Sequence, residues 1–317
     1  MLVVIAVGGK GLLGSQNRLE PDGHRAGSRA VARAIAEVAR HHNVVVTHGS
    51  ASQVGLLAYQ STLSREGSQS SLDVVEAATE GSLGYLLQQE LANELRDREV
   101  ATLLTQVQVD PDDPAFGRDR KLVGPTLAPV DAERMQREWG WEMERAGAGF
   151  RRVVPSPEPM AIVELRTIRR LVSAGVVIIC AGGGGIPVRC DEDGALRGVE
   201  AVIDKDRSAA LLASLLNADL LMYLTDVPAV ASNWGTGFAQ PLGAVSPAVL
   251  QAHRFDPATM GPKVESACRF VLHSGGRAAI GAVADAAGLC AGTAGTQIAA
   301  YSIESARLSG VPGGAAR

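Results

Sequence analysis

Three charged residues, Asp204, Lys205 and Asp206, interrupt the stretch VEAVIDKDRSAALLA between an apolar run and an Ala/Leu-rich helical pattern. Unpaired charges are costly inside a fold. Charges at the point where a strand gives way to a helix are therefore expected to be paired or to bind a ligand. A lysine there offers a mobile point charge for phosphate oxygens, and an aspartate can hold that ammonium group in place. The alternative is a surface Asp–Lys pair that caps the next helix, because aspartate is a good N-cap residue.

Turn residues that could contact a ligand follow other apolar runs of the chain. They are Gly8-Gly9-Lys10, His48-Gly49-Ser50-Ala51, Gly182 to Gly185, and Thr225-Asp226. Glycine lets backbone N–H groups approach a ligand closely, and the N-terminus of a following helix adds partial positive charge. Phosphoryl transfer needs mainly positioning and neutralisation of charge on the transferring group. Glycine turns combined with lysines and one or two aspartates fit that requirement.

Several catalytic motifs are absent from the sequence. There is no P-loop G-x-x-x-x-G-K-[ST], no G-x-G-x-x-G fingerprint, no G-x-S-x-G elbow and no H-E-x-x-H zinc motif. The cysteines Cys180, Cys190, Cys268 and Cys290 form no Cys-x-x-Cys pair and have no histidine at metal-ligand spacing. We therefore expect four buried, reduced thiols, no protein metal site and a cytoplasmic location.

Composition narrows the range of partners. The chain has 317 residues, of which 46% are hydrophobic and 20% charged, and its formal net charge is -4. Without a dense Lys/Arg tract, nucleic acid is not an expected partner. No apolar stretch is long enough to span a bilayer, so a membrane is not expected either. The opening MLVVIAVGGKGLL lacks a basic n-region and reads as a first strand rather than a signal peptide.

Apolar, β-branched runs alternate with amphipathic helical patterns along the chain. Strands are expected at LVVIAVGG, NVVVTHGS, GVVIICAGGGG, DLLMYLTDV and AAIGAV, and helices at GSRAVARAIAEVARHH, QVGLLAYQSTL and MAIVELRTIRRLVSAG. This order predicts an α/β fold with a mainly parallel sheet and helices on both faces, with ligands beyond the carboxyl ends of the strands. Residues 110 to 159, rich in proline and charge, predict a protruding lid, and the tail LSGVPGGAAR is expected to fray.

Nine segments of the chain, taken in order, resemble the carbamate kinase family. They are VVTHGSASQVG, LDVVEAATEGSLGYLLQQEL, TQVQVDPDDPAFGRDRKLVGP, RRVVPSPEP, AGGGGIPV, GVEAVIDKDRSAALLA, NADLLMYLTDV, MGPKVESACRF and AGTAGTQI. The resemblance covers essentially the whole chain. It implies the amino-acid-kinase fold, a three-layer αβα sandwich with an open, mainly parallel sheet. Residues 1–317 would form one such domain, with a protruding lid at about 110–159 and a nucleotide-binding half at about 199–317.

The resemblance also implies an activity and a set of site residues. The activity is the reversible reaction of carbamoyl phosphate with ADP to give carbamate and ATP, with Mg²⁺ arriving with the nucleotide, in a homodimer. Lys205 and Lys263 would contact the transferring phosphoryl group, Asp206 would hold both ammonium groups, and Lys121 would reach down from the lid. The implied nucleotide-binding residues are Asp204, Thr225, Asp226, Val227, Met260 and Gly261. The implied substrate-binding residues are Gly8, Gly9, Lys10, Gly49, Ser50, Ala51, Gly183 and Gly184.

The sequence departs from the family pattern on one side of this implied site. Lys10 stands where the family has asparagine after Gly-Gly, and the second turn reads His-Gly-Ser-Ala-Ser-Gln instead of His-Gly-Asn-Gly-Pro-Gln. An amide that donates and accepts is thereby replaced by a cation in one turn and a hydroxyl in the other. Three hypotheses follow: carbamate kinase activity with Lys10 restoring a lost contact, a kinase of a different small acid, and a non-catalytic nucleotide or carbamoyl-phosphate sensor. Retention of Lys205, Asp206 and Lys263 favours the catalytic hypotheses. His48 is expected either to pack structurally or to touch a ligand.

Overall fold

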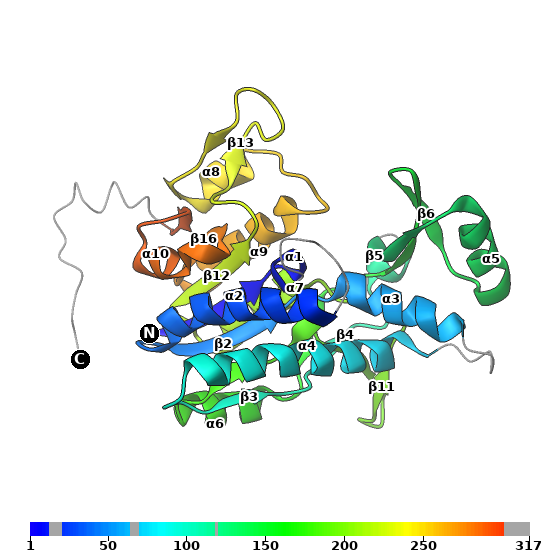
Figure 1. Ribbon diagram of the computed structural model, residues 1–317, viewed down its shortest axis with the longest axis horizontal. Helices are drawn as coiled ribbons and strands as arrows, with labels where there is room; N and C mark the ends of the chain where they lie inside the picture. The colour runs from blue at the N-terminus through cyan, green and yellow to red at the C-terminus, as the bar shows by residue number, and fades with distance from the viewer. Residues whose placement is uncertain (13–20, 64–69, 118–119, 301–317) are drawn as a thin grey trace.

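The computed structural model describes residues 1–12, 21–63, 70–117 and 120–300. The expected fraying of the tail LSGVPGGAAR falls outside these residues. An eight-stranded sheet forms the centre of the molecule (Figure 1). Its strands, in spatial order, are β15 (Ala244–Val245), β17 (Thr296–Ile298), β16 (Arg277–Ala282), β12 (Leu220–Thr225), β1 (Leu2–Val7), β2 (Asn43–His48), β9 (Val177–Ile179) and β3 (Val100–Thr102). From β16 to β3 all neighbours are parallel, and β17 runs antiparallel to β16.

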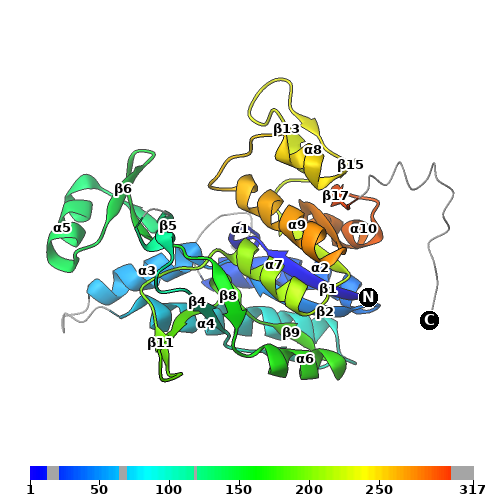
Figure 2. The ribbon, with the colours of Figure 1, turned by 180° about the vertical axis from the view of Figure 1, so that it is seen from behind.

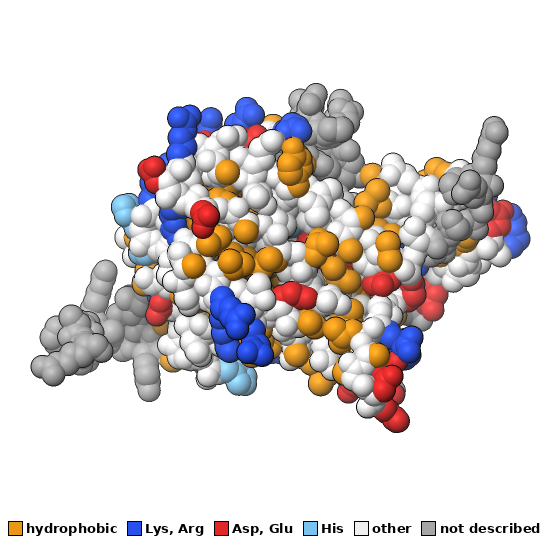
Figure 3. Space-filling model, turned by 90° about the horizontal axis from the view of Figure 1, so that it is seen from below, with side chains coloured by type: hydrophobic (Ala, Val, Ile, Leu, Met, Phe, Trp, Pro, Cys, Tyr) orange, Lys and Arg blue, Asp and Glu red, His pale blue; other side chains and the backbone are white. Residues whose placement is uncertain are grey.

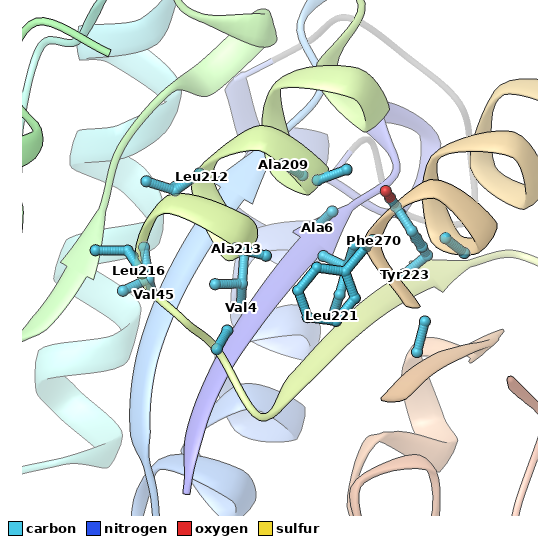
Figure 4. Packing of buried hydrophobic residues seen from close by; sticks show 14 of the residues in the cluster. Val4, Ala6, Val45, Ala209, Leu212, Ala213, Leu216, Leu221, Tyr223 and Phe270 are labelled. Carbon is cyan, nitrogen blue, oxygen red and sulfur yellow. The ribbon is translucent and has the colours of Figure 1, made fainter. Parts of the chain in front are cut away.

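Helices cover both faces of this sheet, which confirms the three-layer prediction. One face carries α2 (Pro21–Ala39), α4 (Leu72–Glu94) and α10 (Ala286–Ala291), and the other carries α6 (Leu165–Ser173), α7 (Lys205–Leu215) and α9 (Met260–Ser274) (Figures 1 and 2). Alternate residues of a strand point to opposite faces. Val3 and Ile5 accordingly pack against α2, whereas Val4 and Ala6 pack against α7 and α9 (Figure 4). The central strands are thus buried on both sides, which explains their unbroken apolar runs.

A separate three-stranded sheet projects from one end of the molecule (Figure 1). It contains β5 (Arg120–Leu127), β7 (Gly149–Pro155) and β6 (Met143–Ala146), and α5 (Pro129–Trp139) joins β5 to β6. It packs on α3 (Ala51–Thr62) through two glycines. A Cβ atom added to Gly55 would lie 2.1 Å from the backbone nitrogen of Gly124, so any side chain there would push the projecting sheet away. This close contact fixes the base of β5, the strand that carries Lys121.

Smaller elements complete the fold. A four-stranded sheet has the order β11 (Leu196–Gly198), β10 (Ile186–Cys190), β4 (Gln106–Val109) and β8 (Pro159–Ile162). A hairpin joins β13 (Ala231–Ser232) to β14 (Gln240–Pro241). The short helices are α1 (Gly9–Leu12), α8 (Pro247–Gln251), η1 (Pro114–Phe116), η2 (Gly182–Gly184) and η3 (Val283–Asp285). In the described part of the chain, no helix combines the length and apolarity needed to cross a membrane.

Three local predictions are wrong. The residues before Asp204 form no strand: 199–204 are irregular, although Ala201, Val202 and Ile203 are buried. The segment 160–175 is not helical throughout, because its start pairs with β4 as strand β8 and the helix α6 begins only at Leu165. Cys190 is exposed near the end of β10, whereas the other three cysteines are buried as expected.

Candidate active site

Asp206 lies between two lysine ammonium groups. Lys205 Nζ donates to Asp206 Oδ1 at 2.6 Å, and Lys263 Nζ donates to Asp206 Oδ2 at 3.1 Å. The lysine side chains are 12% exposed and that of Asp206 is 4% exposed, so water screens the three charges only weakly. Lys205 comes from α7 and Lys263 from α9, two helices that pack side by side. We call Lys205, Asp206 and Lys263 the Lys–Asp–Lys triad.

The two lysines of the triad have unequal surroundings. Burial alone would lower the pKa of Lys205, but Asp206 and Asp204 outweigh this effect and raise the pKa above its usual value. The pKa of Lys263 is lowered, first by burial and then by the neighbouring Lys205 cation, with Asp206 opposing both. Lys205 is therefore the more firmly held cation of the two.

The N-terminus of α7 fixes the triad in place. Asp204 is the N-cap residue, and its Oδ1 accepts from the backbone N–H of Asp206 at 2.9 Å and of Arg207 at 3.3 Å. The Tyr223 hydroxyl donates to the Asp206 carbonyl at 2.8 Å from the neighbouring strand β12. Asp204 thus caps the helix as the alternative expected, but the Asp–Lys pair that follows is buried and not on the surface.

Lys121 reaches the same place from the projecting sheet. Its Nζ donates to the Ile203 carbonyl at 2.9 Å and to Asp204 Oδ2 at 3.2 Å. Burial would raise the pKa of the Asp204 carboxyl, but Lys121 and Lys205 prevail and hold that pKa well below its usual range. The structure therefore gathers three lysines around two adjacent aspartates.

The glycine turns meet beside the triad. A Cβ atom on Gly49 would lie 2.9 Å from the Gly9 nitrogen and 3.0 Å from Lys205 Cδ. Gly184 has φ +112°, and a Cβ there would lie 2.4 Å from the Ile203 carbonyl oxygen. Gly8 belongs to the same edge, since its N–H bonds to the Leu224 carbonyl at 2.9 Å. Only glycine fits such close backbone approaches.

Two further groups of expected site residues lie at this edge of the sheet. Thr225 ends β12, and its hydroxyl donates to the side chain of Asp226 at 3.0 Å, ahead of Val227. Met260 and Gly261 begin α9 and so precede Lys263 by less than one turn. Lys10 belongs to the short helix α1, directly after Gly9, and its side chain is outside the described part of the structure.

Sequence reasoning missed two buried acids on α4. Glu76 and Glu80 lie one helical turn apart beneath the glycine turn η2 and are almost completely inaccessible. The Ser50 hydroxyl donates to Glu76 Oε2 at 3.2 Å. The carboxylate of Glu80 accepts from the backbone N–H of Gly182 at 2.9 Å and of Thr105 at 3.1 Å. The signal was the i, i+4 pair of acids inside LDVVEAATEGSLGY, which share one face of the helix with the buried Leu72, Leu83 and Leu87.

Burial dominates the titration of these groups. It raises the pKa of Glu76 to about 8, against the opposing effects of Lys121 and of the Ser50 hydrogen bond. It also raises the pKa of Glu80 to about 8, although the Thr105 and Gly182 N–H groups oppose the rise. His48, next to this acid pair, is fully buried, which lowers its pKa to about 4. The His48 ring lies against Gly182, where an added Cβ atom would be 2.4 Å from it, so the packing interpretation fits it better.

A second missed signal is the lysine content. Of the 30 lysine and arginine residues, only Lys10, Lys121, Lys205 and Lys263 are lysines. All four are expected site residues, and three of them converge on Asp204 and Asp206. An ammonium group is a compact point charge, whereas guanidinium is a wide planar fork.

Comparisons with known proteins place the chain among phosphotransferases. The model of the amino acid kinase family matches residues 1–282. The carbamate kinase of Rhizobium meliloti is 45% identical over 288 residues, which are 90% of this chain and 89% of that protein. The carbamate kinase of Pyrococcus horikoshii is 43% identical over 309 residues, covering 93% and 98% of the two chains. The structure of Giardia lamblia carbamate kinase bound to AMP-PNP superimposes with a TM-score of 0.84 at 34% identity, over 94% of this chain and 98% of that one.

Proposed function

The chain belongs to the amino acid kinase family and to its carbamate kinases, and we propose that it catalyses the reversible transfer of a phosphoryl group from carbamoyl phosphate to ADP. The observation that carries this proposal is the Lys–Asp–Lys triad, with Lys205 and Lys263 2.6 and 3.1 Å from one buried carboxylate. Relatives that share 45% and 43% of their residues with this chain are carbamate kinases, which supports the same chemistry here.

The proposed reaction needs charge neutralisation more than proton transfer. The bond from phosphorus to the carbamate oxygen breaks, and a terminal oxygen of ADP forms the new bond to phosphorus. The attacking oxygen is already anionic and carbamate leaves as an anion, so no general base has to act. Lys205, Lys263 and Lys121 would balance the charge spread over the phosphoryl oxygens in the transition state. Asp206 would keep the two triad ammonium groups aimed at one point.

The nucleotide is proposed to bind along Asp204, Thr225 to Val227 and Met260-Gly261, at the carboxyl ends of β12 and the start of α9. The structure of the Giardia lamblia relative contains AMP-PNP, which supports an adenine nucleotide here. Mg²⁺ usually binds through substrate phosphates, water and one or two carboxylates. Residues 1–12, 21–63, 70–117 and 120–300 contain no group of three or more His, Cys, Asp or Glu side chains that could hold a metal ion. Bound to the nucleotide, Mg²⁺ would neutralise phosphate charge.

A second copy of the chain is the proposed partner, in a cytoplasmic homodimer. Figure 3 shows hydrophobic side chains gathered on the face where α4 and β3 lie. The exposed Tyr85 and Leu104 belong to these parts of the chain, and Gly81 on α4 lies next to Leu104. Burial of this face against a copy would remove apolar surface from water. A Leu104→Glu variant that sediments at the same mass as the wild type would contradict this assembly.

A second candidate function is a kinase of another small acid. It is favoured by Ser50, whose hydroxyl bonds to Glu76 where the family pattern has an asparagine amide. In both functions the Lys–Asp–Lys triad does the same work, and only the acceptor differs. The sensor hypothesis is disfavoured by Lys205, Asp206 and Lys263, because a sensor need not keep the residues of phosphoryl transfer.

The deciding experiment is ATP formation by the purified chain from ADP, Mg²⁺ and carbamoyl phosphate, beside acetyl phosphate as a near-isosteric donor. We expect sustained turnover with carbamoyl phosphate and much less with acetyl phosphate. Turnover with acetyl phosphate alone would select the second candidate. Nucleotide binding without turnover of either donor would overturn both functions.

A further inference from the structure

Ser50 occupies the N-cap position of α3 but does not cap the helix. Serine at this position normally accepts a hydrogen bond from a backbone N–H of the first turn. The Ser50 side chain makes no such bond, and its backbone angles, φ -140° and ψ -2°, differ from the extended conformation usual for a cap. A residue well suited to capping is therefore held in a different conformation.

Glu76 and Gly183 hold it there. The Ser50 hydroxyl donates to Glu76 Oε2 at 3.2 Å, and both side chains are buried. A Cβ atom on Gly183 would lie 2.3 Å from Ser50 Oγ and 2.3 Å from Glu76 Oε2, so glycine leaves the space that the pair fills. Glu76 Oε1 has no hydrogen-bond partner among the described residues. Ser50 is thus the one described contact through which the Glu76 carboxyl is hydrogen-bonded.

The beginning of α3 is open as a result. The N–H groups of Gln53 and Val54 bond to the Ser50 carbonyl at 2.8 and 2.9 Å. The N–H groups of Ala51 and Ser52 make no hydrogen bond to a described residue, and both residues are partly exposed. First-turn N–H groups carry the positive end of the helix dipole and suit an anion. They follow Gly49, which is in contact distance of Lys205.

Resting on the proposed function, in which carbamoyl phosphate is the donor, we propose that Glu76 is a positioning residue for that substrate. By keeping the Ser50 hydroxyl away from the first turn of α3, it leaves the Ser52 N–H, which a capping hydroxyl would occupy, free beside that of Ala51 for an oxygen of the anionic substrate. Glu76 itself is inaccessible, so it acts through Ser50 and transfers no proton to the substrate. The arrangement gives up the stability of one helix cap in favour of substrate affinity.

The kinetic test uses Glu76→Met, Glu76→Gln, Ser50→Ala and the double variant Glu76→Met/Ser50→Ala. Glu76→Met releases the Ser50 hydroxyl to cap α3, and we expect the KM for carbamoyl phosphate to rise about tenfold, the size of one lost hydrogen bond to a charged group. The KM for ADP and kcat should stay within about twofold. Glu76→Gln keeps an oxygen for Ser50 and should behave as the wild type.

The double variant distinguishes a role of Glu76 that acts through the Ser50 hydroxyl from a general disturbance of the structure. Without the Ser50 hydroxyl nothing can cap α3, so the double variant and Ser50→Ala should have the same KM for carbamoyl phosphate, within about twofold. Thr79→Val, a buried change one turn along α4, is the control and should leave KM unchanged. Equal effects of Glu76→Met in both backgrounds, or no effect in either, would overturn the proposal.

Amide hydrogen exchange measures whether the first turn of α3 is capped, and it needs no activity assay. In the ligand-free wild type, the amides of Ala51 and Ser52 should exchange rapidly. Glu76→Met should slow the Ser52 amide about tenfold or more by capping, and should leave the Ala51 amide, which an N-cap side chain does not reach, unchanged. Wild-type amides already protected without ligand would overturn the proposal, even if Glu76→Met does not fold. A wild type that makes no ATP from carbamoyl phosphate but shows the expected exchange would instead refute the proposed function, and would leave standing only that Glu76 keeps α3 uncapped.

Discussion

The Lys–Asp–Lys triad and the acid pair Glu76–Glu80 lie at opposite ends of the turn η2. The triad pairs opposite charges, whereas the acid pair brings together two groups of the same kind. In the triad every charge has an opposite charge within 3.1 Å. Among the residues that the structure describes, the acid pair has only hydroxyl and backbone N–H donors, and burial raises the pKa of both groups to about 8. Paired charges stay ionised when water is excluded, whereas unpaired acids become neutral. The triad can therefore neutralise a phosphoryl group while the acid pair adds little negative charge beside it.

Substitution of Lys205 in the triad should have the largest effect on activity. We expect Lys205→Ala to lower kcat at least about hundredfold, the size of one lost preorganised electrostatic contact. Lys205→Arg should not restore the rate, because a guanidinium fork would bind the Asp206 carboxylate with two hydrogen bonds and turn its charge away from the phosphoryl group. Steady-state ATP formation measures both variants. Near-normal turnover by either one would remove Lys205 from its proposed role.

Lys121 tests whether the projecting sheet contributes to the same charge cluster. Lys121→Ala removes a cation 3.2 Å from Asp204 Oδ2, and we expect kcat/KM for carbamoyl phosphate to fall about tenfold. Arg145→Ala, on the exposed strand β6 of the same sheet, is the matched control. If both variants lose activity equally, the sheet matters for folding and not for its lysine.

The acid pair is tested by the pH dependence of stability. Glu76 faces Ser50 from α3, Lys121 from β5, Gly183 from η2 and Glu80 on its own helix. Its pKa is about 8 in the folded protein and 4.5 ordinarily, so between these values the folded state holds a proton that the unfolded state has lost. The free energy of unfolding must then fall as pH rises across this window, by up to about 1.4 kcal/mol per pH unit.

Glu76→Gln removes this titration, so its stability relative to the wild type should improve steadily from about pH 5 to about pH 8. Urea unfolding at several pH values measures the difference. Thr79→Val, buried on the same helix and not titratable, should differ from the wild type by a constant amount. A constant difference for Glu76→Gln as well would mean that Glu76 is already ionised at neutral pH, like the carboxylates that are paired with cations.

The strands of the central sheet were predictable because a strand that is buried on both faces consists of consecutive apolar residues. β1, β2, β9, β12 and β16 are found where those runs predicted them. The same signal failed at 199–203, where an apolar run is buried without pairing as a strand. The Val202 N–H bonds to Pro155 and the Val199 N–H bonds to Pro187, so hydrogen bonds to two separate segments replace a ladder. An apolar run indicates that a segment is buried, but the segment to which its backbone is hydrogen-bonded determines whether it forms a strand.

Only part of the site was predictable from the sequence. Lys205 and Asp206 are neighbours in sequence and Lys263 follows in a motif, so the residues of the triad could be named, and the family resemblance implied that Asp206 would hold both ammonium groups. The link between Ser50 and Glu76 spans 26 positions, and it depends on the missing side chain of Gly183. No local pattern encodes such a three-way contact. The resemblance to a family could not supply it either, because Ser50 is one of the residues that depart from the pattern.

Substitution of Lys10 should have the smallest effect. It tests whether the turn Gly8-Gly9-Lys10 acts together with the acid pair or with the triad. It follows Gly9, whose Cβ position lies 3.4 Å from the Gly49 carbonyl oxygen, so its backbone is next to the turn that leads to Ser50. We expect Lys10→Asn to change the KM for carbamoyl phosphate about threefold, because it removes one positive charge from the turn, with the KM for ADP unchanged. Arg25→Asn, on the exposed side of α2, is the control. A change confined to the KM for ADP would place this turn with the nucleotide and the triad instead of with the acid pair.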